Sequence, residues 1–142
     1  MRARIPGICK SLVICGPSGV GKGTLIGKLL AQYPAKFGLS VSHTSRLPRP
    51  GEVDGEHYHF VEVGAIRRDI EAGPFKYLEH ATVHANLYGT REDDVERVHA
   101  AGKVCVLDVD SNGVRQIKSI SYPAKMVFIA PPSIDELEAR LR

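Results

Sequence analysis

The sequence predicts an α/β fold, in which helices flank a parallel sheet and a smaller mixed α+β lobe is inserted. Two observations predict this fold. Short apolar runs near both ends of the chain alternate with segments of helical periodicity, which is typical of parallel sheets. Between these two regions, the sequence pattern changes to short segments of alternating polarity separated by glycine-rich turns. We expect one domain over 1–142, with a core of about 9–38 and 91–142 and an insertion of about 39–90.

Composition excludes several other classes of protein. Apolar residues make up 43% and charged residues 25% of the 142 residues, which excludes a disordered or collagen-like chain. The net charge of +3, without a basic cluster, is too weak to indicate a nucleic-acid partner. No apolar run approaches the roughly 20 residues that span a bilayer, so we expect no membrane partner. Three cysteines (Cys9, Cys15 and Cys105) cannot form a disulfide framework, which favours a soluble, cytoplasmic protein.

The elements follow from apolar periodicity. The run SLVIC at 11–15 ends in glycine and predicts a buried strand. Residues 22–33 carry apolar side chains at helical spacing, and Pro34 ends that helix. Further along, Ser133 precedes a last helical segment. We expect additional strands at 58–61, 75–79, 104–109 and 126–130, and additional helices at 65–72, 91–101, 111–119 and 134–142.

A glycine-rich loop separates the first strand from the first helix. Its glycines let backbone N–H groups converge on phosphate oxygens, and Lys22 can reach the β- and γ-phosphates of a nucleotide. The general pattern puts Ser or Thr directly after the lysine to hold Mg²⁺. Here Gly23 takes that place and the hydroxyl is on Thr24, so the magnesium shell would lean on water and nucleotide oxygens. The alternative, a turn without a ligand, is disfavoured by the combination of strand, lysine and helix, which predicts a P-loop NTPase-type fold. The predicted phosphate-binding residues are Gly16, Pro17, Ser18, Gly19, Val20, Gly21, Lys22, Gly23 and Thr24.

A second anion site is indicated by two arginines three residues apart. Arg46 and Arg49 lie in a loop stiffened by Pro48 and Pro50. Guanidinium groups at that spacing suit one dianionic phosphate, and Tyr58 could add a hydroxyl donor. Taken alone, two arginines are more often a solvated basic loop, so this pattern does not decide the function by itself.

The stretch 44–61 resembles the signature of the guanylate kinase family in its arginine, acidic, glycine and tyrosine spacings. The resemblance continues at Glu79, at Tyr88-Gly89-Thr90 and at Leu107-Asp108-Val109-Asp110, and it covers the chain from about Lys10 to its end. It implies transfer of the γ-phosphoryl group of Mg·ATP to GMP. By that resemblance Lys22, Arg46 and Arg49 would be catalytic, the glycine-rich loop would bind ATP, and GMP would contact Ser42, Arg46, Arg49, Tyr58, Glu79, Tyr88, Thr90 and Asp110.

Guanine chemistry agrees with this assignment. Guanine presents N1–H and N2–H₂ as adjacent donors, and a carboxylate such as Glu79 can accept from both. Adenine lacks that pair, and a site whose buried polar groups need partners can reject a mismatch by factors of roughly 10⁴. Hydroxyls at Ser42 and Thr90 can donate to O6 of guanine.

Two aspartates lie at the end of the strand expected at 104–109. Period-two alternation places Asp108 and Asp110 on one face at the carboxyl end of a strand, where ligands of α/β sheets gather. Asp110 could instead cap the helix that follows; the resemblance favours a ligand role. Asp108, like Thr24, is a candidate for Mg²⁺ or a structural group. No protein ligand is otherwise assigned to a metal.

The six histidines include two pairs at close spacing, His57/His59 and His80/His84. We expect surface polar residues there rather than a zinc site, because no cysteine lies near them and the family needs no zinc.

The end of the chain departs from the family pattern. Residues 133–142 resemble the helix that leads into the family's lid, and the sequence stops before the lid arginines and the last core elements; Arg140 and Arg142 could supply part of that positive charge.

Two function classes therefore stay open: a guanylate kinase enzyme, and a GMP-binding or protein-interaction module without catalysis. A P-loop kinase for another acceptor is a third, opposed by Glu79 and Asp110. We expect a monomer.

Overall fold

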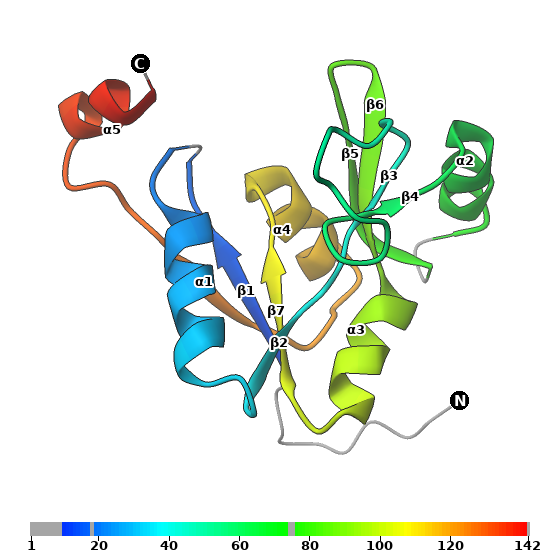
Figure 1. The fold of residues 1–142 in the computed structure, drawn as a ribbon, viewed down its shortest axis with the longest axis horizontal. Coiled ribbons are helices and arrows are strands. Elements are labelled where there is room, and N and C mark those ends of the chain that lie inside the picture. The colour runs from blue at the N-terminus through cyan, green and yellow to red at the C-terminus, as the bar shows by residue number, and fades with distance from the viewer. Residues whose placement is uncertain (1–9, 18, 74–75, 142) are drawn as a thin grey trace.

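The computed structural model describes residues 10–17, 19–73 and 76–141, which form two four-stranded sheets with helices around them. Figure 1 shows the core sheet at the centre and the second sheet beside it, with the β5–β6 hairpin rising away from the core. The predicted α/β class with a parallel, helix-flanked sheet is confirmed. Across the described residues, no helix has the length and apolar character that a membrane span requires.

The core sheet has the strand order β2-β7-β1-β8, and every neighbouring pair is parallel. Its two central strands, β1 and β7, are buried apolar runs of the sequence, because a strand buried on both faces needs apolar side chains on each. Predicted and observed bounds agree closely for the two central strands. The strands are β1 (Ser11–Cys15), β2 (Phe37–Leu39), β7 (Val104–Asp108) and β8 (Lys125–Phe128).

Alternating side chains of β1 and β7 build a core on each face of the sheet. Val13 and Leu107 are register partners and pack with Ile117 of α4 on one face. Ile14 and Val106 pack with Ile26 of α1 on the other face. The covering helices are α1 (Lys22–Gln32), α3 (Glu92–Ala100) and α4 (Ser111–Ser119).

The second sheet has the order β4-β3-β6-β5 and mixes parallel with antiparallel pairs. The β5–β6 hairpin turns at His84 and Ala85, both at positive φ (49° and 65°), a conformation that is uncommon outside glycine. Gln116 of α4 ties this sheet to the core through two hydrogen bonds with the backbone of His80, at 2.9 and 2.8 Å. The elements are β3 (His43–Thr44), β4 (His59–Phe60), α2 (Val63–Glu71), β5 (Tyr77–Val83) and β6 (Asn86–Arg91).

Helix α5 (Ile134–Leu141) follows a long connection and lies apart from both sheets in Figure 1. It meets the glycine-rich loop: Arg140 Nη1 donates to the carbonyl of Val20 at 3.1 Å, and Leu141 lies against Gly19. Ser133 caps the helix as expected, since its hydroxyl accepts from the Glu136 amide at 3.0 Å. Arg142 lies outside the described residues.

Several predicted bounds were wrong. The helix expected from residue 91 begins at Glu92, because Arg91 ends β6, and the strand expected at 126–130 is Lys125–Phe128. The strand expected at 58–61 shrinks to His59–Phe60, and the one expected at 75–79 is Tyr77–Val83, with Phe75 outside the described residues. Strands β2, β3 and β6 were not predicted; β2 and β3 are very short, and β6 contains Gly89 and shows little apolar alternation.

Candidate nucleotide-binding site

The glycine-rich loop runs from the end of β1 to the start of α1, as its sequence requires. Gly19 and Gly21 have φ of 79° and 102°, in the left-handed region that glycine adopts without a Cβ penalty. Gly21 occupies the N-cap position, so the free amides of the first helical turn point out of the loop. This is the arrangement in which a helix N-terminus receives an anion. Ser18 lies outside the described residues.

Lys22 is the first residue of α1, and its side chain reaches the end of the neighbouring strand β7. Its Nζ lies 3.7 Å from Oδ1 of Asp108, the last residue of β7, and its side chain is 17% exposed. The parallel β1–β7 pairing creates this contact, because it brings the carboxyl ends of both strands to one edge. Thr24 is exposed on the first turn of α1.

A cleft of about 320 Å³ lies between α1 and the second sheet. Its walls bring together residues that were predicted from separate parts of the sequence, and they include residues of α1 together with Leu39 of β2 and Leu107 of β7. The predicted residues that line it are Gly23, Ser42, Tyr58, Thr90 and Asp108.

Glu79 stands behind this wall on β5, in register with Thr90 of β6. The Thr90 hydroxyl donates to Glu79 Oε1 at 2.6 Å. Burial raises the pKa of Glu79; the Thr90 hydrogen bond opposes the rise, and the carboxylates of Asp110 and Asp108 add to it. The single hydroxyl hydrogen of Thr90 is thus directed at Glu79, and the donation to O6 of guanine expected of Thr90 stays a prediction.

Arg46 is held by a partner that the sequence analysis did not single out. Its Nη1 and Nη2 donate to the two carboxylate oxygens of Glu52 at 2.8 and 3.0 Å, and its Nε donates to the Tyr88 hydroxyl at 3.2 Å. The guanidinium also stacks on Tyr58, 5.3 Å from the ring centroid. These contacts raise the pKa of Arg46 and lower that of Glu52 to about 2. The sequence feature that could have indicated this contact is the position of Glu52, six residues after Arg46 in a loop stiffened by prolines.

Arg49 is placed differently from Arg46. Its side chain is exposed, and its backbone amide donates to Glu52 Oε1 at 2.7 Å. The carboxylate of Glu52 therefore fixes the backbone between the two arginines. It orients Arg46 and leaves the Arg49 guanidinium to solvent.

Asp110 makes the helix cap that the sequence left as an alternative. Its Oδ1 accepts from the Gly113 amide at 2.8 Å, at the N-terminus of α4. Capping uses one carboxylate oxygen, and the group remains close enough to Glu79 to raise the pKa of that residue. The GMP contact expected of Asp110 stays a prediction, as do the other nucleotide contacts.

Comparison with known proteins agrees with this geometry. The guanylate kinase family model matches residues 9–142. The chain is 55% identical over 133 residues to guanylate kinase 1 of Oryza sativa subsp. japonica, covering 94% of this chain and 34% of that protein. It is 50% identical to guanylate kinase of Sus scrofa, covering 66% of it. The crystal structure of guanylate kinase from Anaplasma phagocytophilum superposes with a TM-score of 0.67 at 32% identity, covering 94% of this chain and 66% of that one. The chain thus spans between about a third and two thirds of the length of these relatives, and it belongs to the guanylate kinase family.

Proposed function

We propose that this protein transfers the γ-phosphoryl group of Mg·ATP to GMP, giving ADP and GDP. The observation that carries the proposal is the pairing of two unlike sites across one cleft. On the side of the core, Gly23 of the first helical turn and Asp108, the ion-pair partner of Lys22, line this cleft; on the side of the second sheet Thr90 lines it and holds the buried Glu79. The first suits phosphates and the second suits a base with adjacent N–H donors.

In the proposed reaction a phosphate oxygen of GMP attacks the γ-phosphorus of ATP. The new P–O bond forms as the bond to the β–γ bridging oxygen breaks, and ADP leaves with that electron pair. Because the acceptor is already an ionised phosphate, no general base is needed. Lys22 would hold the β- and γ-phosphates, and Arg46 and Arg49 the acceptor phosphate, so that catalysis rests on alignment and charge neutralisation.

The oxygen groups beside the phosphate loop fit Mg²⁺. The Asp108 carboxylate and the Thr24 hydroxyl are hard oxygen donors of the kind that Mg²⁺ takes, together with water and phosphate oxygens. Bound there with ATP, the ion would neutralise charge on the phosphates. ATP and GMP are the proposed partners, with the monomer as the working form. A cytosolic location is part of the proposal and accords with Cys15 and Cys105 being free, buried thiols.

The test is ADP formation by the purified chain with Mg·ATP, with GMP or AMP as acceptor. We expect turnover that depends on GMP, is abolished by Arg49→Ala, and is unaffected by Arg115→Ala, which removes an exposed arginine of α4 outside the cleft. Equal use of AMP would refute the guanine-reading role of Glu79. GMP binding without turnover would support the other candidate, a binding module without catalysis; absence of GMP binding would overturn both.

A further inference from the structure

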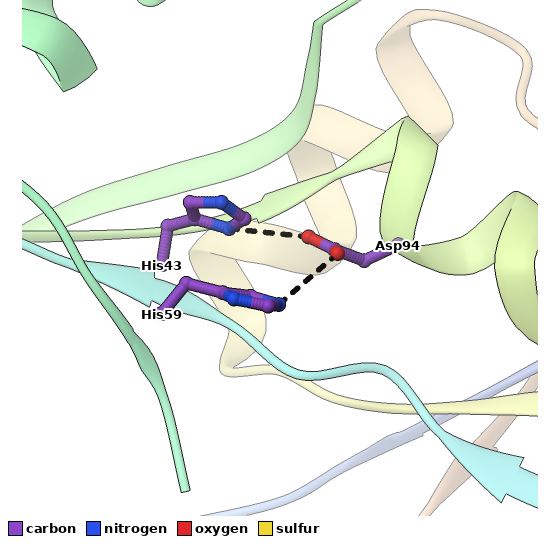
Figure 2. Close-up of side chains that lie close together, drawn as sticks. All are labelled: His43, His59 and Asp94. Atoms are coloured by element: carbon purple, nitrogen blue, oxygen red, sulfur yellow. Dashed lines mark ion pairs between the residues drawn. The ribbon is translucent and has the colours of Figure 1, made fainter. Parts of the chain in front are cut away.

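Two histidines and an aspartate converge at the junction of the second sheet with the core. His43 of β3 and His59 of β4 are register partners in the parallel pair, so their side chains leave the sheet on the same face. Figure 2 shows both imidazole rings turned toward Asp94, which comes from the first turn of α3. His43 Nδ1 lies 3.1 Å from Asp94 Oδ2, and His59 Nε2 lies 3.2 Å from Asp94 Oδ1.

The centre of this cluster is buried and incompletely satisfied. Asp94 is 5% exposed, and the His43 side chain is 12% exposed. Although His43 Nδ1 and Asp94 Oδ2 are close, their geometry is not that of a hydrogen bond, and neither atom has another hydrogen-bond partner among the described residues. Buried polar atoms almost always have a partner, so a pair of them facing each other indicates something that binds between them.

The spacing of the ligand atoms suits a metal ion. One atom from each of the three side chains lies within 4.8 Å of those of the other two. A tetrahedral ion with bonds of about 2.1 Å needs ligand atoms about 3.4 Å apart, so rotations that move these atoms by under about 1 Å would complete the set. Mg²⁺ prefers oxygen ligands, whereas two imidazoles and a carboxylate suit Zn²⁺ and its first-row neighbours.

We propose that His43, His59 and Asp94 bind Zn²⁺, with water completing the coordination, as a site separate from the nucleotide cleft. None of the three lines that cleft. The ion would join β3 and β4 of the second sheet to α3 of the core and hold the two parts together. This site was not expected from the sequence, where His59 was paired with His57; the structure instead has His57 Nδ1 accepting from the Val53 amide at 2.9 Å.

Arg97 offers a way to separate metal binding from a purely structural role. Its Nη1 donates to Asp94 Oδ1 at 2.9 Å, and its side chain is 72% exposed. The guanidinium competes with a cation for that oxygen and repels it. Arg97→Gln should therefore raise the Zn²⁺ affinity several-fold, whereas in a cluster that only folds the protein the same change would leave Zn²⁺ binding as weak as before.

The experiment uses the whole 142-residue chain without a histidine tag and without nucleotide, in a Cys9→Ser background, because thiolates also bind zinc. Zn²⁺ is titrated against a chromogenic chelator, and Co²⁺ is used as a spectroscopic probe. We expect one ion per chain and a visible Co²⁺ spectrum without a thiolate charge-transfer band. His59→Gln and Asp94→Asn should each weaken binding by about 100-fold, at the upper end of what loss of a supporting group costs at metal sites. His84→Asn, which removes an exposed histidine at the hairpin turn, should leave the affinity unchanged.

The proposal is overturned if the unsubstituted protein binds Zn²⁺ no more tightly than the His59→Gln variant, or if the Co²⁺ spectrum reports sulfur ligands. Should both ligand variants fail to fold, the Co²⁺ spectrum of the unsubstituted protein and the effect of Arg97→Gln still decide. An unchanged Zn²⁺ affinity in Arg97→Gln, together with a Co²⁺ spectrum identical to that of the aqueous ion, would leave the three residues as a structural cluster.

Discussion

Glu79 is an ionisable group in a place that disfavours charge. Its pKa is raised by burial and by nearby carboxylates, so the folded state binds a proton more tightly than the unfolded state. The carboxyl group therefore costs no folding free energy below its ordinary pKa, and the cost grows as the pH rises through that value toward the raised pKa. The group that we propose reads guanine is kept at a cost in stability.

Replacing this carboxylate should stabilise the protein and weaken GMP binding. We expect Glu79→Gln to raise the free energy of unfolding at pH 7 by about 0.5–2 kcal/mol, the range of single stabilising substitutions. The gain should vanish below pH 4.5, the ordinary pKa of glutamate, because the carboxyl group is then neutral in both states. Urea unfolding at pH 7 and below pH 4.5 measures this difference in unfolding free energy, with the exposed Glu71→Gln as control. A lower stability of Glu79→Gln at pH 7 would contradict this account.

The pKa of Glu52 is shifted in the opposite direction from that of Glu79. Its pKa is lowered to about 2 by the hydrogen bonds from Arg46 and from the Arg49 amide, so the folded state favours the charged form. Its contribution to stability is complete above pH 4.5 and is lost as the pH falls toward 2. We expect Glu52→Gln to lower the urea midpoint at pH 7, and the difference from the unsubstituted protein to narrow below pH 4.5. A difference that is constant with pH would show that lost packing, not charge, is responsible.

Single residues of the site differ in how far the sequence predicted them. The glycine-rich loop with its lysine could be predicted because the motif is local and its chemistry is specific, whereas the arginine pair became a candidate only through the family resemblance. Glu52 could not be assigned as the partner of Arg46, since its role depends on how the loop folds back. The cluster of His43, His59 and Asp94 draws on three elements, and no spacing along the chain encodes that meeting.

Helix α4 shows how one side chain can have two roles. Asp110 caps the helix through the Gly113 amide, and we propose that it also contacts GMP. Asp110→Ala should cost about 0.5–2 kcal/mol of unfolding free energy, the usual price of a lost N-cap. Asp110→Asn keeps a capping oxygen and removes the charge, so it should preserve stability and weaken GMP binding. Thermal unfolding and GMP titration of both variants check this, and equal destabilisation by the two would contradict the capping role.

Elements with many residues and strong periodicity were predictable, and very short ones were not. Strand β1 and helix α1 show the apolar runs and helical spacing on which such predictions rest. Strand β3 has two residues and exists because His43 and Thr44 pair with β6 and β4, distant in the chain. Its conformation is set by tertiary contacts, which a local pattern does not contain.

The second sheet is joined to the core by the packing of Leu78 and by Gln116, which makes two hydrogen bonds with the backbone of His80. Gln116→Met keeps the size of the side chain but leaves the His80 amide and carbonyl without these partners. We expect a loss of about 1–3 kcal/mol in unfolding free energy and faster hydrogen exchange at the His80 amide. Lys118→Met, an exposed change on the same helix, is the matched control. Unchanged exchange at His80 would mean that other contacts hold the sheets together.

The contact between Lys22 and Asp108 has a consequence for the molecule as a whole. Because the lysine already has a counter-ion 3.7 Å away, a phosphate that approaches it must replace a carboxylate. The Coulomb energy gained is then the difference between the attraction of Lys22 to the ligand and its attraction to Asp108, and a singly charged ligand gains little. A polyphosphate brings several charges to the same point and gains much more. We therefore expect Lys22 to favour polyphosphates over small, singly charged anions.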